Sequence, residues 1–188
     1  MANFASGSLA SVVAALRAGG VVAYPTEAVF GLGCDPRALP ALARIARLKQ
    51  RPTDLGYILV ADDLGELAPY LDPLEPELAA RVAASWPGPV TWIWPAAPGV
   101  PDALTGGRDT LAVRVTAHPE TRALCRAFGG ALVSTSANRH GHAPARSAAE
   151  VQTMFGDALD AVLDAPCGGD ARPTEIRDAR SGAVLRAG

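Results

Sequence analysis

Two basic side chains stand two residues apart in the segment Lys49-Gln50-Arg51, at the predicted end of a helix. A lysine ammonium is a compact point charge and an arginine guanidinium is a planar, two-pronged donor, so together they suit a chain of phosphates. Cations near a helix C-terminus are also favoured simply by the helix dipole. The pair alone therefore leaves a phosphate site and two solvated cations as alternatives.

Hydroxyl and amide side chains are concentrated in Ser134-Thr135-Ser136-Ala137-Asn138, directly after an apolar stretch at 131–133 that predicts a strand. In open α/β sheets, ligands bind beyond the carboxyl ends of strands. These side chains can bind phosphate oxygens, a ribose or an amino acid. The alternatives are a turn whose hydroxyls bond their own backbone, and a serine hydrolase with Ser136 as its nucleophile.

Thr26 and Glu27 stand in a similar position, because they follow an apolar stretch at 21–24 and Pro25. A hydroxyl and a carboxylate in a loop at the end of a strand can contact a polar ligand. The structural alternative is that Glu27 caps the following helix and Thr26 completes a turn. The sequence leaves both interpretations open.

Arg114 and Arg186 each lie within an apolar stretch that predicts a strand. An arginine on a buried strand is costly unless it is paired. Its partner is either a structural aspartate or glutamate, or the carboxylate of a ligand. The sequence does not decide between the two.

Common nucleotide-binding and nucleophile motifs are absent from the sequence. There is no GxxxxGK[ST] loop, no GxGxxG after a strand and no GxSxG elbow. His140 and His142 flank Gly141, but no third metal ligand is apparent, and catalytic zinc usually takes three protein ligands. We therefore predict no metal site built from protein side chains, and any ATP must be bound by a different scheme.

Helices and strands that could position these residues alternate along the chain. Apolar periodicity and capping residues predict helices over 9–16, 38–49, 64–71, 76–85, 119–128 and 147–155. Strands are predicted over 21–24, 57–60, 90–94, 111–115, 131–133, 161–163 and 183–186. The alternation predicts one α/β domain over residues 1–188, with a twisted mixed sheet flanked by helices. The stretch 95–107, rich in proline and glycine, is predicted as a long loop that acts as a lid or a simple connection.

Composition limits the function classes. The 188 residues are 49% hydrophobic and 19% charged, which is typical of a globular protein, and the net charge of −2 argues against a strongly basic nucleic-acid binder. The three cysteines form no CxxC pair, so we expect reduced thiols. No signal peptide and no apolar run near the ~18 residues of a membrane span are present, and we expect a cytoplasmic protein without a membrane partner.

The order of six motifs resembles the YrdC family over nearly the whole chain. Each motif is weak alone, but six in this order are specific. The motifs are Ala23-Tyr24-Pro25-Thr26-Glu27-Ala28-Val29-Phe30-Gly31-Leu32-Gly33-Cys34-Asp35, Leu48-Lys49-Gln50-Arg51-Pro52, Trp86-Pro87-Gly88-Pro89-Val90-Thr91, Leu111-Ala112-Val113-Arg114-Val115, Ser134-Thr135-Ser136-Ala137-Asn138 and Pro173-Thr174-Glu175-Ile176-Arg177-Asp178. The segment Arg139-His140-Gly141 departs from the family's usual Leu-Ser-Gly.

The resemblance implies a concave ligand-binding groove and an activity. Members of the family form threonylcarbamoyl-adenylate and pyrophosphate from L-threonine, bicarbonate or carbon dioxide, and ATP, for the modification of a tRNA adenosine beside the anticodon. The resemblance implies that the catalytic residues are Lys49 and Arg51. It implies that ATP is bound by Lys49, Arg51, Ser136, Asn138 and Arg186, and threonine by Thr26, Arg114, Ser134 and Thr174.

The resemblance also implies partners. Mg²⁺ is expected on the phosphates of ATP, held largely by phosphate oxygens and water. The product is expected to pass to proteins that transfer the threonylcarbamoyl group to tRNA. Two further alternatives stay open at this point: an RNA-binding or tRNA-binding module, and the carbamoyl-adenylate chemistry of related hydrogenase-maturation domains.

Overall fold

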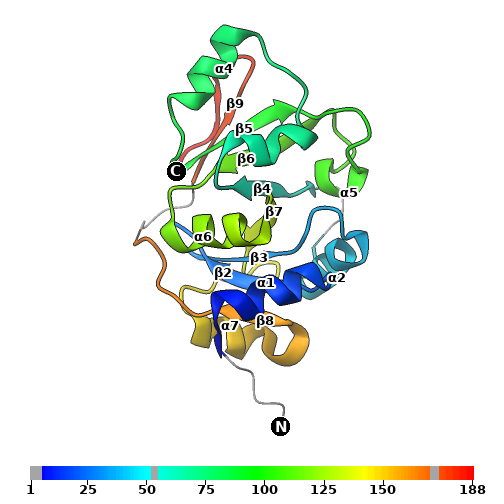
Figure 1. Ribbon diagram of the computed structural model, residues 1–188, viewed down its shortest axis with the longest axis vertical. Coiled ribbons are helices and arrows are strands. Elements are labelled where there is room, and N and C mark those ends of the chain that lie inside the picture. Colours follow the sequence, from blue (N-terminus) through cyan, green and yellow to red (C-terminus); the bar gives the residue numbers. More distant parts are fainter. Residues whose placement is uncertain (1–5, 52–54, 170–173) are drawn as a thin grey trace.

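The strands of the chain join edge to edge in one mixed sheet, with helices packed against it (Figure 1). The computed structural model describes residues 6–51, 55–169 and 174–188. Within these ranges the sheet has ten strands, in the order β1-β8-β2-β3-β7-β4-β6-β5-β9-β10. Parallel pairs such as β4 with β6 occur beside antiparallel pairs such as β2 with β3. The predicted fold class, a mixed α/β sheet flanked by helices, is confirmed.

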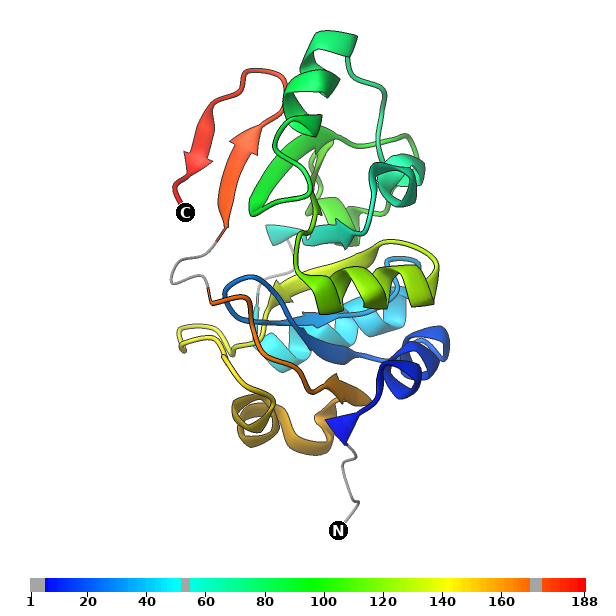
Figure 2. The same cartoon turned by 60° about the vertical axis from the view of Figure 1, so that its left-hand side comes forward.

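The strands are short, and most lie close to the predicted stretches. Their bounds are β1 Ser6–Gly7, β2 Val22–Pro25, β3 Phe30–Gly33, β4 Ile58–Ala61, β5 Val90–Pro95, β6 Thr110–Val115, β7 Leu132–Ser136, β8 Ala161–Leu163, β9 Glu175–Asp178 and β10 Val184–Arg186. The direction of the strands turns along the sheet, from nearly level at β2 and β3 to upright at β9 and β10 (Figure 2). This turning is the right-handed twist that strands of L-amino acids accumulate across a sheet.

The helices have the bounds α1 Leu9–Arg17, α2 Leu39–Lys49, α3 Leu64–Leu67, α4 Pro76–Ala83, α5 Asp102–Thr105, α6 Pro119–Phe128 and α7 Ala148–Phe155, with 3₁₀ turns η2 Ala68–Tyr70 and η3 Gly156–Ala158. Three helices, α1, α3 and α7, begin at a residue whose side chain accepts a hydrogen bond from the first turn, namely Ser8, Asp63 and Ser147. The Ser147 hydroxyl accepts a hydrogen bond from the Glu150 backbone N–H at 3.2 Å, as predicted for the start of α7. The Glu150 carboxylate reaches back to the backbone N–H of Arg146 instead of that of Ser147. None of the helices in the described ranges has both the length and the apolar character that crossing a bilayer requires.

Two apolar clusters hold the helices against opposite faces of the sheet. Side chains along β4 alternate between them, with Leu59 in one cluster and Val60 in the other, because successive side chains of a strand point to opposite faces. Helices α1 and α6 pack in the cluster of Val60, and α2 and α7 in the cluster of Leu59. At about 25 cal/mol per Å² of buried apolar surface, such burial on both faces is the main favourable contribution to folding.

Three strands and one helix were not predicted, namely β1, β3, β9 and α5. Strand β3 has the sequence Phe-Gly-Leu-Gly, and glycine is depleted in strands, so its local preference is weak. A Cβ at Gly33 would lie 2.2 Å from the carbonyl oxygen of Val133, so only glycine allows β3 to approach its neighbour so closely. The predicted loop 95–107 contains the short helix α5.

The end of β7 corrects a second prediction. The strand runs through Ser136, so Ser134 and Ser136 belong to the strand instead of following it. The backbone of this segment pairs with β3 on one side and β4 on the other, and this pairing makes it a strand although its side chains are rich in hydroxyls. Two motif residues, Pro52 and Pro173, lie outside the described residues.

Candidate functional site

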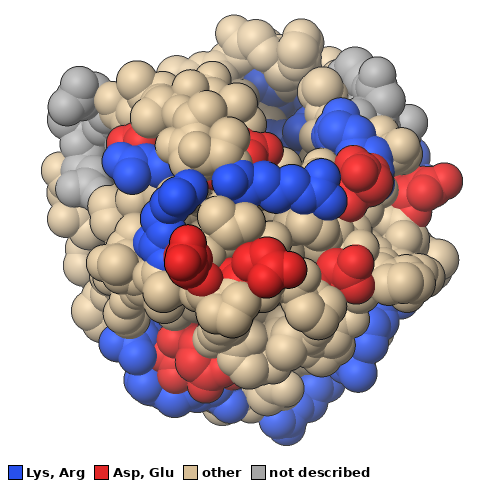
Figure 3. Space-filling view, turned by 90° about the horizontal axis from the view of Figure 1, so that it is seen from above, with Lys and Arg blue, Asp and Glu red and all other residues tan. Residues whose placement is uncertain are grey.

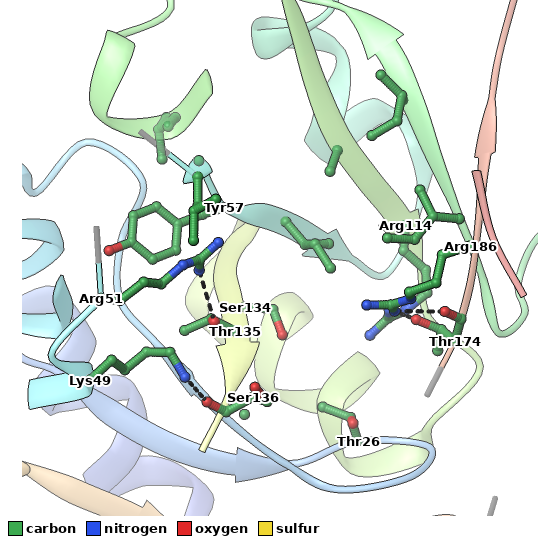
Figure 4. Close-up of a pocket in the computed structure, with 18 of the residues that line it drawn as sticks. Thr26, Lys49, Arg51, Tyr57, Arg114, Ser134, Thr135, Ser136, Thr174 and Arg186 are labelled. Atoms are coloured by element: carbon green, nitrogen blue, oxygen red, sulfur yellow. Dashed lines mark hydrogen bonds between the residues drawn. The ribbon is translucent and has the colours of Figure 1, made fainter. Parts of the chain in front are cut away.

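A cavity of about 680 Å³ lies against the sheet, and its volume is typical of pockets that hold small molecules or cofactors (Figure 4). All nine side chains to which the resemblance assigns ATP or threonine line it: Thr26, Lys49, Arg51, Arg114, Ser134, Ser136, Asn138, Thr174 and Arg186. Glu27, the other candidate ligand contact after β2, does not line it. These residues come from the ends of α2 and β2, from β6, β7 and β10, and from the start of β9. The tertiary structure therefore gathers six separate segments around one hollow.

Cationic side chains occupy two opposite sides of this cavity (Figure 4). We call the side formed by Lys49, Arg51, Ser136 and Asn138 the Lys49 end. The side formed by Arg114 and Thr174 is called the Arg114 end. An elongated ligand with an anionic group at each extremity would match both sides at once.

The backbone turns sharply after α2, and this turn directs Lys49 and Arg51. Gln50 has φ 52° and ψ 42°, a left-handed conformation that is uncommon for a residue other than glycine. The backbone N–H of Arg51 still bonds the carbonyl oxygen of Ala46 at 3.1 Å, so the turn closes the helix. A strained backbone conformation persists only where the surrounding structure holds it in place. Such conformations are concentrated at functional sites.

The Lys49 ammonium is saturated by acceptors from the segment that follows β7. It donates to the carbonyl oxygen of Ser136, to the carbonyl oxygen of Asn138 at 3.0 Å and to the Asn138 side-chain oxygen at 3.1 Å. Lys49 is only 5% exposed. Burial, together with the nearby charge of Arg51, lowers the pKa of Lys49 to about 8. The lysine therefore fixes the end of β7 and brings a positive charge to the cavity wall.

Arg51 is oriented by a hydroxyl and by an aromatic ring. Its guanidinium donates to the Thr135 hydroxyl at 3.2 Å, and its central carbon lies 5.2 Å from the centre of the Tyr57 ring. A cation at this distance over a ring face is attracted by the negative face of the π system. Thr135 and Tyr57 were not predicted as site residues, although both line the cavity.

Asn138 links the loop after β7 to itself. Its side-chain oxygen accepts from the Ser136 hydroxyl at 2.6 Å, and its nitrogen donates to the carbonyl oxygen of His142 at 2.8 Å. The backbone N–H of His140 donates to the carbonyl oxygen of Lys49 at 2.8 Å, which ties the segment that departs from the family pattern to α2. The loop after β7 therefore bonds its own backbone, as one alternative predicted, and its residue Asn138 also lines the cavity.

Arg114 is held by side chains from three other segments. One terminal nitrogen of its guanidinium donates to the hydroxyls of Thr91 and Thr174, each at 3.1 Å. The other lies 3.4 Å from a carboxylate oxygen of Glu27. The structural partner that the sequence left open is therefore Glu27. Arg114 also lines the cavity, so a ligand carboxylate remains within its reach.

The environment of Glu27 favours the ionised carboxylate. Burial opposes ionisation, but the charge of Arg114 and the hydrogen bond from Thr116 hold the pKa of Glu27 below its usual value. The Thr116 hydroxyl donates to the carboxylate at 2.6 Å. Glu27 therefore does not cap a helix, which was one of its two predicted roles.

Thr26, Ser134 and Arg186 complete the wall. The Thr26 hydroxyl donates to the carbonyl oxygen of Val29 at 2.7 Å, so it completes a turn as one alternative proposed. Ser134 is 6% exposed, on the strand between the two ends. Arg186 on β10 donates to the backbone carbonyl oxygen of Thr174 at 2.7 Å and thereby anchors the segment beside Arg114.

Thr91 and Glu27 were named in motifs, but neither was assigned the role that the structure gives it. Both contact Arg114 from segments that are distant in sequence, Thr91 from β5 and Glu27 from the turn after β2. The one available signal was the buried arginine, which requires acceptors without indicating which residues supply them.

The fold and the cavity define an α/β protein whose pocket presents cationic side chains on two sides. A family model for Sua5/YciO/YrdC proteins, described as telomere recombination, matches residues 14–188. The chain belongs to the Sua5/YciO/YrdC family.

Individual relatives agree with this assignment. A threonylcarbamoyl-AMP synthase of Halorhodospira halophila is 61% identical over 173 residues, which cover 92% of this chain and 91% of the relative. Escherichia coli YciO superposes with a TM-score of 0.78 at 29% identity, over 95% of this chain and 87% of YciO.

Pyrococcus abyssi Sua5 in complex with L-threonine superposes with a TM-score of 0.88 at 29% identity, over 95% of this chain. The match covers 53% of Sua5, so the chain spans about half the length of that protein.

Proposed function

We propose that this chain forms threonylcarbamoyl-adenylate and pyrophosphate from L-threonine, bicarbonate or carbon dioxide, and ATP. The observation that carries the proposal is the convergence of the nine side chains that the resemblance implies, from six separate segments, on one cavity with a cationic group at each side. The names of close relatives and the threonine complex of a structural neighbour support it.

The reaction joins a carbamate of threonine to the adenylyl group of ATP. The amine of threonine combines with bicarbonate or carbon dioxide to give a carbamate, and bicarbonate loses water in this step. A carbamate oxygen then attacks the α-phosphorus of ATP, and the bond to pyrophosphate breaks. Such a transfer depends on positioning and on neutralising charge, so it needs no nucleophilic side chain. The serine hydrolase alternative is therefore unnecessary for Ser136.

The Lys49 end is proposed to hold the triphosphate. Lys49 and Arg51 are the proposed catalytic cations, with Ser136 and Asn138 as further ATP contacts on the same side. Arg186 lies beside Thr174 at the Arg114 end, so ATP would have to extend across the cavity to contact it. The Lys49 hydrogens already bond acceptors after β7, so a phosphate oxygen must replace one of those acceptors. Exchange of one hydrogen bond for another leaves the charge in place, and the attraction of the anion supplies the net gain.

The Arg114 end is proposed to hold threonine. The guanidinium of Arg114 suits a carboxylate, because its planar fork matches two oxygens. Thr26, Ser134 and Thr174 offer hydroxyls and backbone groups around the same part of the cavity. Threonine bound there would present its amine toward the cavity and the nucleotide.

Mg²⁺ is proposed to enter on the phosphates of ATP. Among the described residues, no group of three or more histidine, cysteine, aspartate or glutamate side chains is arranged to hold a metal. Mg²⁺ at nucleotide sites commonly keeps several waters and takes phosphate oxygens with one or two carboxylates. The ion would shield the phosphate charges, and the residues of this chain would align the groups that react.

The labile adenylate is proposed to pass to proteins that transfer the threonylcarbamoyl group to tRNA in the cytoplasm.

RNA binding by this chain alone is the second candidate function. On the face shown in Figure 3, basic side chains are interspersed with acidic ones. A mixed field of this kind favours weak binding that salt disrupts.

Mass spectrometry tests the proposal directly. Protein incubated with ATP, Mg²⁺, threonine and ¹³C-bicarbonate should yield an adenylate one mass unit heavier than the product from ordinary bicarbonate. Pyrophosphate release should require both threonine and bicarbonate. Tight, salt-dependent RNA binding without pyrophosphate release would overturn the proposal in favour of the RNA-binding candidate. Product formed from carbamoyl phosphate in place of threonine would favour carbamoyl-adenylate chemistry.

A further inference from the structure

The hydrogen-bonding capacity of Arg114 is only partly used within the protein. One terminal nitrogen bonds two threonine hydroxyls, and the other faces Glu27. The Nε of Arg114 has no hydrogen-bond partner among the described residues, although the side chain is buried. A buried donor without an acceptor is destabilising and rare in native structures, so this N–H of Arg114 indicates that a ligand supplies the acceptor.

The ion pair between Glu27 and Arg114 is loose. The nearest terminal nitrogen lies 3.4 Å from Oε2 of Glu27, and among the described residues this oxygen has no hydrogen-bond partner either. Both side chains are almost fully buried, at 4% exposure for Arg114 and 6% for Glu27. A full two-pronged salt bridge would use two N–H donors of the guanidinium, and here those donors are not consumed.

Glu27 is itself held from behind, away from the cavity lining. Its Oε1 accepts from the Thr116 hydroxyl at 2.6 Å, and the same hydroxyl oxygen accepts from the backbone N–H of His118 at 3.1 Å. The backbone of the neighbouring residue, Thr26, accepts from the N–H of Gly168 at 3.0 Å. The carboxylate is therefore bonded to the residue that follows β6, and Arg114 lines the cavity whereas Glu27 does not.

We propose that Glu27 is a positioning residue for threonine binding, acting through Arg114. It fixes the plane of the guanidinium and balances its charge, yet it leaves N–H donors for the carboxylate of the amino acid. This inference rests on the proposed function, because it assigns threonine to the Arg114 end.

A purely structural ion pair is the competing explanation, and the chain contains a matched example. Asp62 is 8% exposed and lies 2.5 Å from Arg122, in a close hydrogen-bonded contact outside the cavity lining. Removing one partner of a buried pair destabilises a protein in either case. Only a positioning residue should also change the affinity for threonine.

The test compares Glu27→Gln with Asp62→Asn. Each replacement removes the charge of a buried carboxylate and preserves its shape, although the arginine partners of Asp62 are more exposed than Arg114. In Glu27→Gln, we expect the dissociation constant for threonine, measured by calorimetry, and its KM to rise about tenfold or more, since a charged hydrogen bond is disturbed. The KM for ATP should stay within about twofold of the wild-type value, because the Lys49 end is unchanged. Asp62→Asn should lower the melting temperature without changing threonine binding.

Two further variants keep the inference testable if Glu27→Gln fails to fold. Glu27→Asp retains the charge and should restore part of the threonine affinity. Thr116→Val releases Oε1 and should raise the threonine KM by roughly threefold, the size of a modest hydrogen bond. Wild-type threonine affinity in folded Glu27→Gln, or in both other variants, overturns the positioning role. Absence of threonine binding and of threonine-dependent pyrophosphate release in the wild-type protein overturns the proposed function instead.

Discussion

The two ends of the cavity are built in different ways. At the Lys49 end, the ammonium bonds mostly backbone oxygens of one nearby segment, Ser136 to Asn138. At the Arg114 end, the guanidinium bonds only side chains, and these come from the turn after β2, from β5 and from the start of β9.

This difference has an energetic consequence. Backbone acceptors stay in place when a side chain is replaced, so the Lys49 end should tolerate change in its neighbours. The Arg114 end is a network of buried polar side chains, in which each lost partner leaves another group unsatisfied. The following four predictions test that contrast, and the expected effects decrease from one to the next.

The largest effect is expected for Arg114→Lys. The lysine keeps the charge but cannot reproduce the planar fork that meets two threonine hydroxyls and a carboxylate. We expect kcat/KM for threonine to fall by about 100-fold or more, since two charged hydrogen bonds are disturbed. Steady-state pyrophosphate release at varied threonine measures this loss.

Arg122→Lys is the control, because Arg122 belongs to a partly buried ion pair outside the cavity lining. It should leave threonine kinetics unchanged. Equal losses in Arg114→Lys and Arg122→Lys would mean that the Arg114 end acts through stability alone.

Replacement of Lys49 should have the second largest effect. Lys49→Ala removes a cation from the cavity wall and frees the segment after β7, so we expect about 10- to 150-fold lower kcat/KM for ATP. Arg47→Ala provides a matched control, because Arg47 is an exposed cation in the same last turn of α2. Wild-type kinetics in Lys49→Ala would remove this lysine from the site.

The pH dependence of the reaction should reveal the charge of Lys49. With a pKa of about 8, the ammonium of the free enzyme loses its proton as the pH rises through 8. If phosphate binding needs the cation, kcat/KM for ATP should fall above pH 8 by about tenfold per pH unit. Lys49→Arg should flatten this decline, because a guanidinium stays charged.

Stability should change in the opposite direction. The pKa of Lys49 is lowered from 10.5 to about 8 on folding, so the unfolded chain binds more protons between these values. The contribution of Lys49 to the free energy of unfolding should therefore rise from pH 8 to pH 10.5 and be absent in Lys49→Ala. Denaturant titrations across this range check the sign.

The smallest effects compare two threonine hydroxyls that each accept from an arginine. Thr91→Val should raise the threonine KM by roughly fivefold, because Thr91 is fully buried and its loss leaves Arg114 short of an acceptor. Thr135→Val, beside the more accessible Arg51, should change the KM for ATP by about twofold. If Thr135→Val changes its KM more than Thr91→Val does, the Arg114 end is not the more sensitive of the two.

The Lys49 end was the easier one to predict from the sequence. Its cations lie within three consecutive residues, and its hydroxyls lie within one short segment, so a local pattern indicated both. The saturation of Lys49 by backbone oxygens was not predictable, because main-chain acceptors carry no sequence signature. At the Arg114 end, the buried arginine was visible, but Glu27 and Thr91 were not identifiable as its partners.

The six motifs and the family that they resemble indicated nine of the polar side chains that line the cavity. From local pattern alone, the sequence determined the order of the helices and most strands, and the caps Ser8 and Ser147 at the starts of α1 and α7. These follow from periodicity and local hydrogen bonding, which depend on neighbours within a few residues. The tertiary structure decided that β3 pairs between β2 and β7, that Ser134 lies within a strand, and that Glu27 meets Arg114. Contacts of this kind join residues far apart in the chain, and their energy exists only once the sheet has brought those residues together.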